Sequence, residues 1–288
     1  MKAKKTTEYK GMAAIAQALC RVRDQCRADE RREADPVGFV HLYTDTLDQE
    51  MVGLIAALLA FGNVKALRAK IADALQRLGE RPALFADRED EVFEKLRGWK
   101  HRVYGDKDLA GLVIAARRLQ KREGSLGAAF AHSLSLKKNM RDALSHWVLC
   151  IRNEWPGHGG NNRGALHLLP DPGKGSAVKR LMLYLRWMVR PSDGVDLGLW
   201  PISPSLLCMP VDTHIHKLSL NLGFTDRKQA NWQTMEDITA AMRSISAEDP
   251  VQFDFALCHL GMLQHCPSRR DSVQCEGCGI QNVCKYWA

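Results

Sequence analysis

The stretch "EMVGLIAALLAF", from Glu50 to Phe61, is almost continuously apolar and predicts a buried helix. The next segment, "NVKALRAKIADALQRLG", begins at Asn63 and ends at Gly79, a residue that commonly stops helices. Its apolar residues recur at helical spacing: Val64, Leu67, Ile71, Leu75 and Leu78. The segments "DLAGLVIAARRLQKREG" and "NMRDALSHWVLCIRNEW" repeat this pattern, and the period-two alternation of strands is almost absent. The sequence therefore predicts an all-α protein.

The chain is basic and long enough for a substantial core. Its 288 residues are 45% hydrophobic, and its formal net charge is +8 with a pI near 9.1. This charge favours a polyanionic partner, chiefly nucleic acid. No apolar run reaches the roughly 18 residues of a membrane span, and the basic segment "MKAKKTTEYKG" lacks the apolar core of a signal peptide. We therefore expect a soluble, cytoplasmic protein with no membrane partner.

Four of the nine cysteines crowd into the last 23 residues, with the spacing Cys266-x8-Cys275-x2-Cys278-x5-Cys284. In a cytosolic chain such crowding indicates a metal site more than disulfides. Four thiolates can surround either a zinc ion or a [4Fe–4S] cluster. Zinc ribbons usually carry two x2 pairs and this chain has one, which favours the cluster and leaves zinc, or free thiols, as the alternatives.

This four-cysteine loop resembles that of endonuclease III and the adenine glycosylases, in the helix-hairpin-helix superfamily of DNA glycosylases. The resemblance implies a two-lobed, all-α glycosylase fold with a [4Fe–4S] cluster in its C-terminal loop. The first gap is two residues longer than is usual in the family, and Arg269 and Arg270 lie in it. The resemblance implies that these arginines lie near DNA phosphates, and the alternative is a solvated loop.

The segment "LLPDPGKGSAVKRLMLYLRWMVR" resembles the hairpin of the same superfamily and the helix that follows it. The resemblance implies that four hairpin residues contact DNA: Gly173, Lys174, Gly175 and Ser176. Ser176 is also a candidate N-cap. Pro172 and Asp171 depart from the family pattern, because one removes a backbone N–H and the other adds a negative charge, so the hairpin is expected to be degenerate.

Lys179 lies in the first turn of the next helix, and Arg186 and Arg190 follow it on a face away from the apolar residues. We expect this basic stripe to hold a DNA backbone. A free lysine has a pKa of about 10.4, but the helix dipole, nearby arginines and desolvation favour the neutral amine. Such an amine can attack the sugar C1′ and form a Schiff base. The alternative is that Lys179 contacts phosphate or solvent.

Asp212 precedes a helix-like run in "PVDTHIHKLSLNLGFT". Its position predicts an N-cap, and a carboxylate held by helix N–H groups stays ionised. "PVDTH" resembles the superfamily motif whose aspartate stabilises the oxocarbenium-like sugar or accepts a proton from the nucleophile. We therefore expect Asp212 to cap the helix and to act in catalysis, and His214 to face DNA or the helix surface.

A flipped base needs a stacking surface and hydrogen-bonding groups. Asp193, Asp196 and Trp200, in the long loop after Arg190, are weak candidates for this pocket, and the alternative is a structural loop with a buried tryptophan. Asn63 occupies the position where relatives place a residue that fills the gap left by the flipped base.

The long connection between Lys179 and Asp212 is similar to that of archaeal oxoguanine glycosylases, and the full pattern resembles an uncharacterised bacterial branch of the superfamily. We expect residues 1–35 to pack with the C-terminal lobe, residues 36–190 to form a helical lobe that includes the Lys179 helix, and residues 191–288 to form the lobe of Asp212 and the cysteines.

The resemblance implies a monomeric, nucleoid-associated base-excision repair enzyme. It would be a glycosylase with AP-lyase activity that removes an oxidised or otherwise damaged base from double-stranded DNA. Two alternatives remain: a non-catalytic iron–sulfur protein that binds DNA or RNA, and a zinc protein with an unrelated role.

Overall fold

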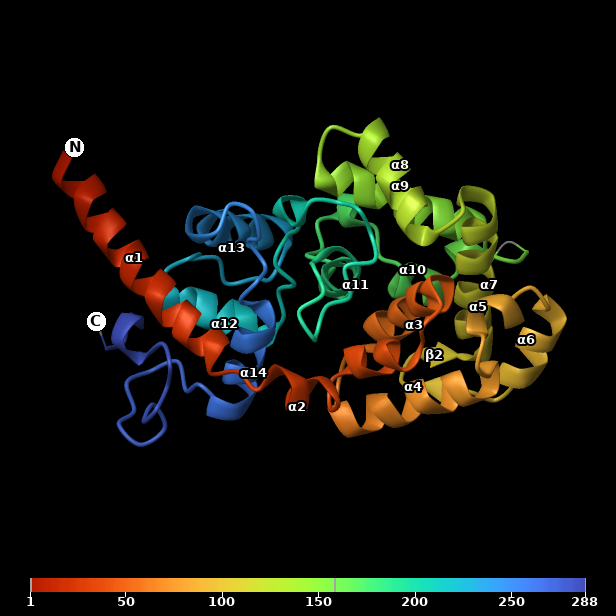
Figure 1. The fold of residues 1–288 in the computed structure, drawn as a ribbon, viewed down its shortest axis with the longest axis horizontal. Coiled ribbons are helices and arrows are strands. Elements are labelled where there is room, and N and C mark those ends of the chain that lie inside the picture. The colour runs from red at the N-terminus through yellow and green to blue at the C-terminus, as the bar shows by residue number, and fades with distance from the viewer. Residues whose placement is uncertain (1, 158, 288) are drawn as a thin grey trace. The chain divides into compact units, whose positions relative to one another are not determined.

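The computed structural model describes residues 2–157 and 159–287, and these are mostly helical (Figure 1), which confirms the all-α class. Two short strands, β1 (Lys100–His101) and β2 (Tyr104–Gly105), pair antiparallel as a small hairpin. No helix among the described residues is long and apolar enough to cross a membrane. The chain forms two compact units: the central unit, Asp29–Ile202, and the terminal unit, Met1–Ala28 with Ser203–Ala288.

The core of the central unit is built on α3 (Thr46–Leu59), the helix that the apolar stretch predicts. Nearly all its residues from Glu50 onward are buried. It packs against η1 (Pro36–Leu42), α7 (Asp106–Glu123) and α11 (Lys179–Val189). Gly53 allows the close approach of α11, because a Cβ atom there would lie 2.8 Å from Cε of Met188.

The other helices of the central unit surround this core (Figure 1). Helices α8 and α9 lie side by side, and α6 packs on α4 and α7. The bounds are α2 (Ala28–Arg32), α4 (Val64–Leu78), α5 (Pro82–Phe85), α6 (Glu89–Leu96), α8 (Leu126–Leu136), α9 (Met140–Asn153), η2 (Gly159–Asn161), α10 (Arg163–Leu168) and η3 (Pro172–Lys174).

The terminal unit joins the two ends of the chain. Helix α1 (Lys2–Asp24) packs on α13 (Trp232–Ile245), α14 (Asp254–Gln264) and η5 (Gln281–Val283), and α14 packs on α12 (Thr213–Leu222). The short η4 (Pro204–Leu206) opens the second part of this unit. The unit boundaries, at residues 28/29 and 202/203, lie seven residues before and twelve after those expected at 35/36 and 190/191.

Candidate metal centre and catalytic residues

The four clustered cysteines line one cavity of about 20 Å³ in the terminal unit. Cys275 and Cys284 are buried, Cys266 and Cys278 are partly exposed, and none is in a disulfide. A tight turn joins the x2 pair, because the N–H of Cys278 donates to the carbonyl of Cys275 at 3.1 Å. The loop between α14 and η5 thus brings together side chains that span nineteen residues of sequence.

The donor set of this cavity is all thiol. Its other lining residues carry amide, aromatic, apolar or guanidinium groups: Asn221, Gln264, Pro267, Arg269, Ile280, Gln281, Tyr286 and Trp287. Burial raises the pKa of Cys278 and of Cys284, and charge on the neighbouring cysteines raises it further. A bound cation would offset that repulsion, so the chemistry of these four donors suits a Cys₄ zinc site or a four-iron cluster. Their positions do not match the arrangement around a single ion, because among residues 2–157 and 159–287 no group of three or more His, Cys, Asp or Glu side chains is placed to hold one.

The C-terminal half of helix α12 contacts the cysteine loop. The Nδ2 group of Asn221 donates to Sγ of Cys266 at 3.2 Å, and Nζ of Lys217 donates to the Cys266 carbonyl. The N–H of Lys285 returns to the Asn221 carbonyl at 2.9 Å. One helix therefore carries Asp212 at its start and touches the cysteine loop near its end.

The prediction that Asp212 caps this helix is confirmed. Its Oδ1 atom accepts from the backbone N–H groups of His214 at 2.9 Å and Ile215 at 2.8 Å. Its Oδ2 atom lies 3.4 Å from Sγ of Cys258, on the adjacent α14. His214 itself packs against α14, because a Cβ atom on Gly261 would lie 2.7 Å from the His214 Cβ. One carboxylate oxygen of Asp212 is thus held by the start of the helix, and the other oxygen contacts the Cys258 thiol.

Lys179 is the first residue of α11, as predicted. Its side chain is partly buried and makes no hydrogen bond or ion pair with any residue that the structure describes. The preceding Val178 has φ +40° and ψ 44°, a left-handed conformation that is costly for a β-branched residue. Ser176 is not the N-cap, since Val178 holds that position and the Ser176 hydroxyl accepts only the Val178 N–H at 3.2 Å.

The hairpin expectation needs a correction, because its backbone N–H groups are already bonded within the chain. The N–H of Gly173 donates to Oδ1 of Asp171 at 2.8 Å and to Ser145. The N–H of Lys174 donates to the Asp171 carbonyl at 3.1 Å, and that of Gly175 donates to Pro172 at 2.9 Å. The N–H groups of Gly173, Lys174 and Gly175 are therefore not open to a phosphate, whereas the Lys174 side chain is exposed.

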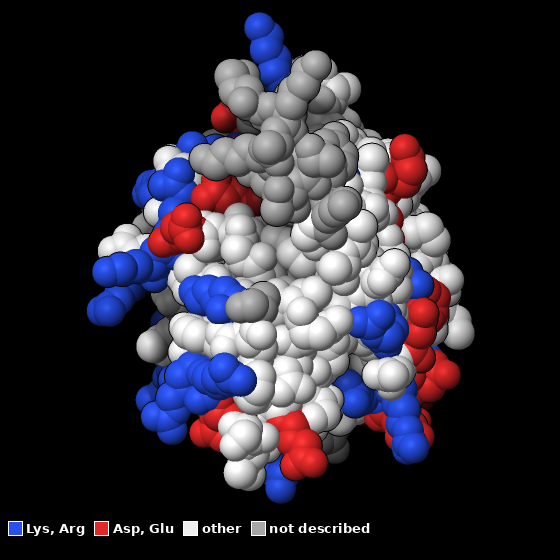
Figure 2. Space-filling view, turned by 90° about the vertical axis from the view of Figure 1, so that its left-hand side faces the viewer, with Lys and Arg blue, Asp and Glu red and all other residues white. Residues whose placement is uncertain are grey.

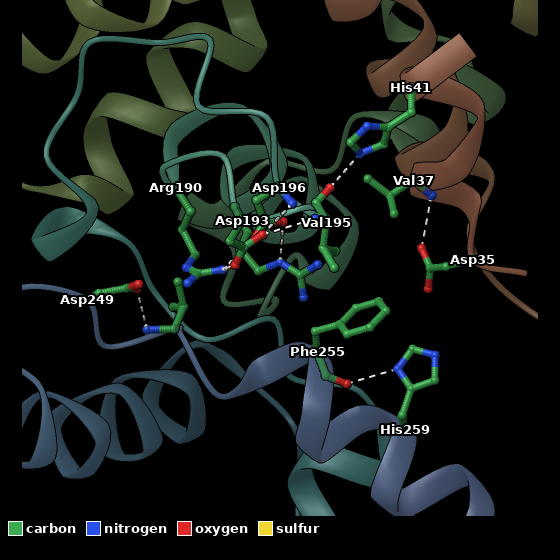
Figure 3. Close-up of polar contacts among 12 residues, drawn as sticks. Asp35, Val37, His41, Arg190, Asp193, Val195, Asp196, Asp249, Phe255 and His259 are labelled. Atoms are coloured by element: carbon green, nitrogen blue, oxygen red, sulfur yellow. Dashed lines mark hydrogen bonds and ion pairs between the residues drawn. The ribbon is translucent and has the colours of Figure 1, made fainter. Parts of the chain in front are cut away.

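The prediction that Arg186 and Arg190 form a basic stripe for DNA is wrong, because both side chains are buried. Arg186 is 2% exposed and donates to Oδ1 of Asp196 at 3.1 Å. Arg190 pairs with Asp193 at 2.7 Å and with Asp196, as Figure 3 shows. The loop after α11 folds back over this face, because the N–H of Leu197 donates to the Trp187 carbonyl at 2.8 Å. The two arginines are thus buried structural residues and do not form a surface for DNA.

The same loop gives Asp193, Asp196 and Trp200 structural roles, so the base-pocket assignment is corrected to its alternative. Asp196 is 0% exposed between the two arginines, and Oδ1 of Asp193 accepts the N–H groups of Val195 and Asp196. Trp200 is buried in a cluster of rings: Phe130, Trp147 and Tyr184.

A buried carboxylate that sequence reasoning missed lies beneath Trp200. Oε1 of Glu50 accepts from Nε1 of Trp200 at 2.8 Å and from the Gly127 N–H at 2.9 Å. Oε2 accepts from the Leu126 N–H at 2.8 Å and from Gln120 at 3.0 Å. Burial raises the pKa of Glu50, and these four donors lower it in part. The signal in the sequence was an acidic residue at the first position of an almost continuously apolar stretch. In the structure Glu50 holds α3, α8 and Trp200 together through these hydrogen bonds.

The remaining predicted DNA contacts lie at the surface. Arg269 is 75% exposed and lies 3.8 Å from Asp271, whereas the exposed Arg270 stacks on the ring of Trp287. Asn63 is exposed and caps α4 by accepting the Ala66 N–H at 3.1 Å. On the face drawn in Figure 2, lysine and arginine side chains are mixed with acidic ones and with uncharged surface. The positive charge is therefore not gathered into one continuous patch on that face.

Comparison with known protein families assigns the chain to one family. Residues 35–263 match the family described as "Protein of unknown function (DUF2400)", and the chain belongs to this family. The searches of curated proteins and of solved structures found no match to the chain.

Proposed function

We propose that the chain is an iron–sulfur DNA glycosylase with AP-lyase activity, as its resemblance to the helix-hairpin-helix superfamily implies. The observation that carries this proposal is the cavity lined by Cys266, Cys275, Cys278 and Cys284, supported by the helix that Asp212 caps. The substrate is a damaged base in double-stranded DNA, and the positive net charge of +8 suits this partner.

The four cysteine thiolates hold a [4Fe–4S] cluster, and zinc is the alternative. When bound, the cluster supplies a rigid core that fixes the loop between α14 and η5. Because all four of its ligands are protein thiolates, its role is structural and it leaves no iron open to substrate. Asn221 and Lys217 then anchor α12 to the loop through Cys266.

Lys179 supplies the nucleophile. Its partly buried amine is not held in any ion pair or hydrogen bond with the described residues, so its lone pair is available once the amine is neutral. The amine nitrogen forms a bond to the sugar C1′, the glycosidic C1′–N bond breaks, and the base leaves with a proton. The sugar ring then opens to a Schiff base with Lys179, and loss of a C2′ proton expels the 3′ phosphate.

Asp212 supplies a fixed carboxylate. Its Oδ1 is engaged by two backbone N–H groups, which leaves Oδ2 to stabilise positive charge on the sugar. The thiol of Cys258 orients this oxygen at 3.4 Å.

Borohydride trapping tests this activity on duplexes that each carry one damaged base. We expect a covalent protein–DNA adduct, because a Schiff base is reducible. Lys179→Gln should abolish the adduct, whereas Lys138→Gln, at an exposed lysine outside the predicted DNA contacts, should retain it. Trapping by Lys179→Gln at the native level would place the nucleophile elsewhere.

A second candidate is a non-catalytic iron–sulfur protein that binds nucleic acid. The bonded N–H groups of the hairpin and the buried Arg186 and Arg190 favour this candidate over the enzyme, because they remove predicted contacts that would hold DNA next to Lys179. It predicts DNA binding without an adduct on any lesion, and an affinity that Lys179→Gln leaves unchanged.

A further inference from the structure

Trp287, a residue beside the cysteine cavity, carries a buried indole N–H. Trp287 lines this cavity together with the four cysteines. Its Nε1 atom is buried and has no hydrogen-bond partner among the residues that the structure describes. A buried N–H without an acceptor costs free energy, and nearly all such groups in folded proteins are paired. The acceptor is therefore expected inside the cavity, in whatever the four thiols bind.

Trp287 makes two contacts with residues of the cysteine loop. The backbone N–H of Trp287 donates to the Cys284 carbonyl at 2.7 Å, which ties the residue to one of the four thiols. The guanidinium carbon of Arg270 lies 4.6 Å from the ring centroid, in a cation–π contact. These two contacts keep Trp287 beside the cysteine cavity.

None of the cysteine sulfurs serves as its acceptor in the described residues. The sulfur of Cys266 accepts a hydrogen bond from Asn221 instead, at 3.2 Å. A zinc ion would bring no further acceptor, because four thiolates complete its tetrahedral coordination. A four-iron cluster would differ, since its inorganic sulfides can accept hydrogen bonds.

We infer that the indole N–H of Trp287 donates a hydrogen bond to an inorganic sulfide of the cluster, and that this bond raises the reduction potential. This inference rests on the proposed cluster in the same four cysteines. One-electron reduction makes the cluster more negative, and an N–H donor stabilises the reduced form more than the oxidised one. Asn221 acts in the same direction through Cys266. Trp287 is therefore a positioning and tuning residue of the metal centre.

Trp287→Phe tests the inference in the full chain, purified anaerobically and with its iron content measured first. The substitution removes the N–H and keeps an aromatic ring for Arg270. Titration with dithionite, followed by electron paramagnetic resonance, should give a more negative midpoint potential than in the native protein. Tyr286→Phe is the matched control, because Tyr286 lines the same cavity and loses only a hydroxyl group, and its midpoint potential should stay native.

A second measurement on the native sequence covers the case in which Trp287→Phe takes up no iron. With ¹⁵N-labelled tryptophan, pulsed electron paramagnetic resonance of the reduced cluster should detect an indole nitrogen coupled through the hydrogen bond. An iron-loaded Trp287→Phe protein with the native potential, or no ¹⁵N coupling in the labelled protein, would overturn the tuning role alone. Zinc without iron in the native protein would instead overturn the proposed cluster, and the inference with it.

Discussion

At the scale of single residues, Asp212 has an observed role as a helix cap and a proposed role in catalysis, and the two are separable. Its Oδ1 caps α12 through two backbone N–H bonds, whereas the proposed catalytic role needs the negative charge. Asparagine keeps a cap but removes the charge, and alanine removes both. The two substitutions therefore report on different properties of one side chain.

We expect Asp212→Asn to slow base removal strongly while changing the free energy of unfolding little. Asp212→Ala should slow it equally and also lower the stability by about 0.5–2 kcal/mol, because the cap is lost. Single-turnover assays and urea denaturation measure the two effects. Native rates for Asp212→Asn on an active substrate would leave this carboxylate as a cap only.

At the scale of elements, the polar face of α11 is stabilised by the loop that folds over it. Asp196 is buried between Arg186 and Arg190, and Trp200 on the same loop reaches Glu50 in the core. Removing one partner of such a buried group leaves an uncompensated charge, which costs far more than breaking an exposed pair.

Asp196→Asn should therefore lower the free energy of unfolding by about 3–5 kcal/mol. Asp193→Asn is the control, because Asp193 is 41% exposed and asparagine keeps an Oδ1 for the N–H groups of Val195 and Asp196, so this change should cost less than Asp196→Asn. Urea denaturation of both variants measures the difference. Equal stabilities would mean that the buried ion pairs do not hold the loop on α11.

At the scale of the whole molecule, the proposed function requires a bound metal cluster and an affinity for nucleic acid. The protein purified without oxygen should be yellow-brown and contain about four irons and four sulfides per chain, because a [4Fe–4S] cluster absorbs visible light and a zinc site does not. Metal analysis and an absorption spectrum test this. A colourless protein with one zinc per chain would exclude the cluster.

Binding to duplex DNA should weaken steeply with salt, since each neutralised phosphate contributes about 0.9 to the negative slope of log K against log salt. With Arg186 and Arg190 buried, the exposed Arg269 and Arg270 are the candidates that remain in the cysteine loop. Changing both to glutamine should reduce the slope by about 0.9 for each phosphate that the protein no longer neutralises. An unchanged slope would mean that other residues bind the phosphates, and a native slope near zero would remove nucleic acid as a partner.

Local patterns in the sequence determined the helical class, the cap at Asp212, the start of α11 at Lys179 and the grouping of the four cysteines. These features depend on neighbours within one helical turn or one short loop, so the local spacing of residue types and the motif resemblance predict them. Only the tertiary structure decided the burial of Arg186 and Arg190, because the loop that covers them is not part of the α11 pattern. It also decided the pairing of Glu50 with residues 70 to 150 positions away. The same holds for Asn221 and Trp287 beside the cysteines, because such contacts arise from chain folding over long separations.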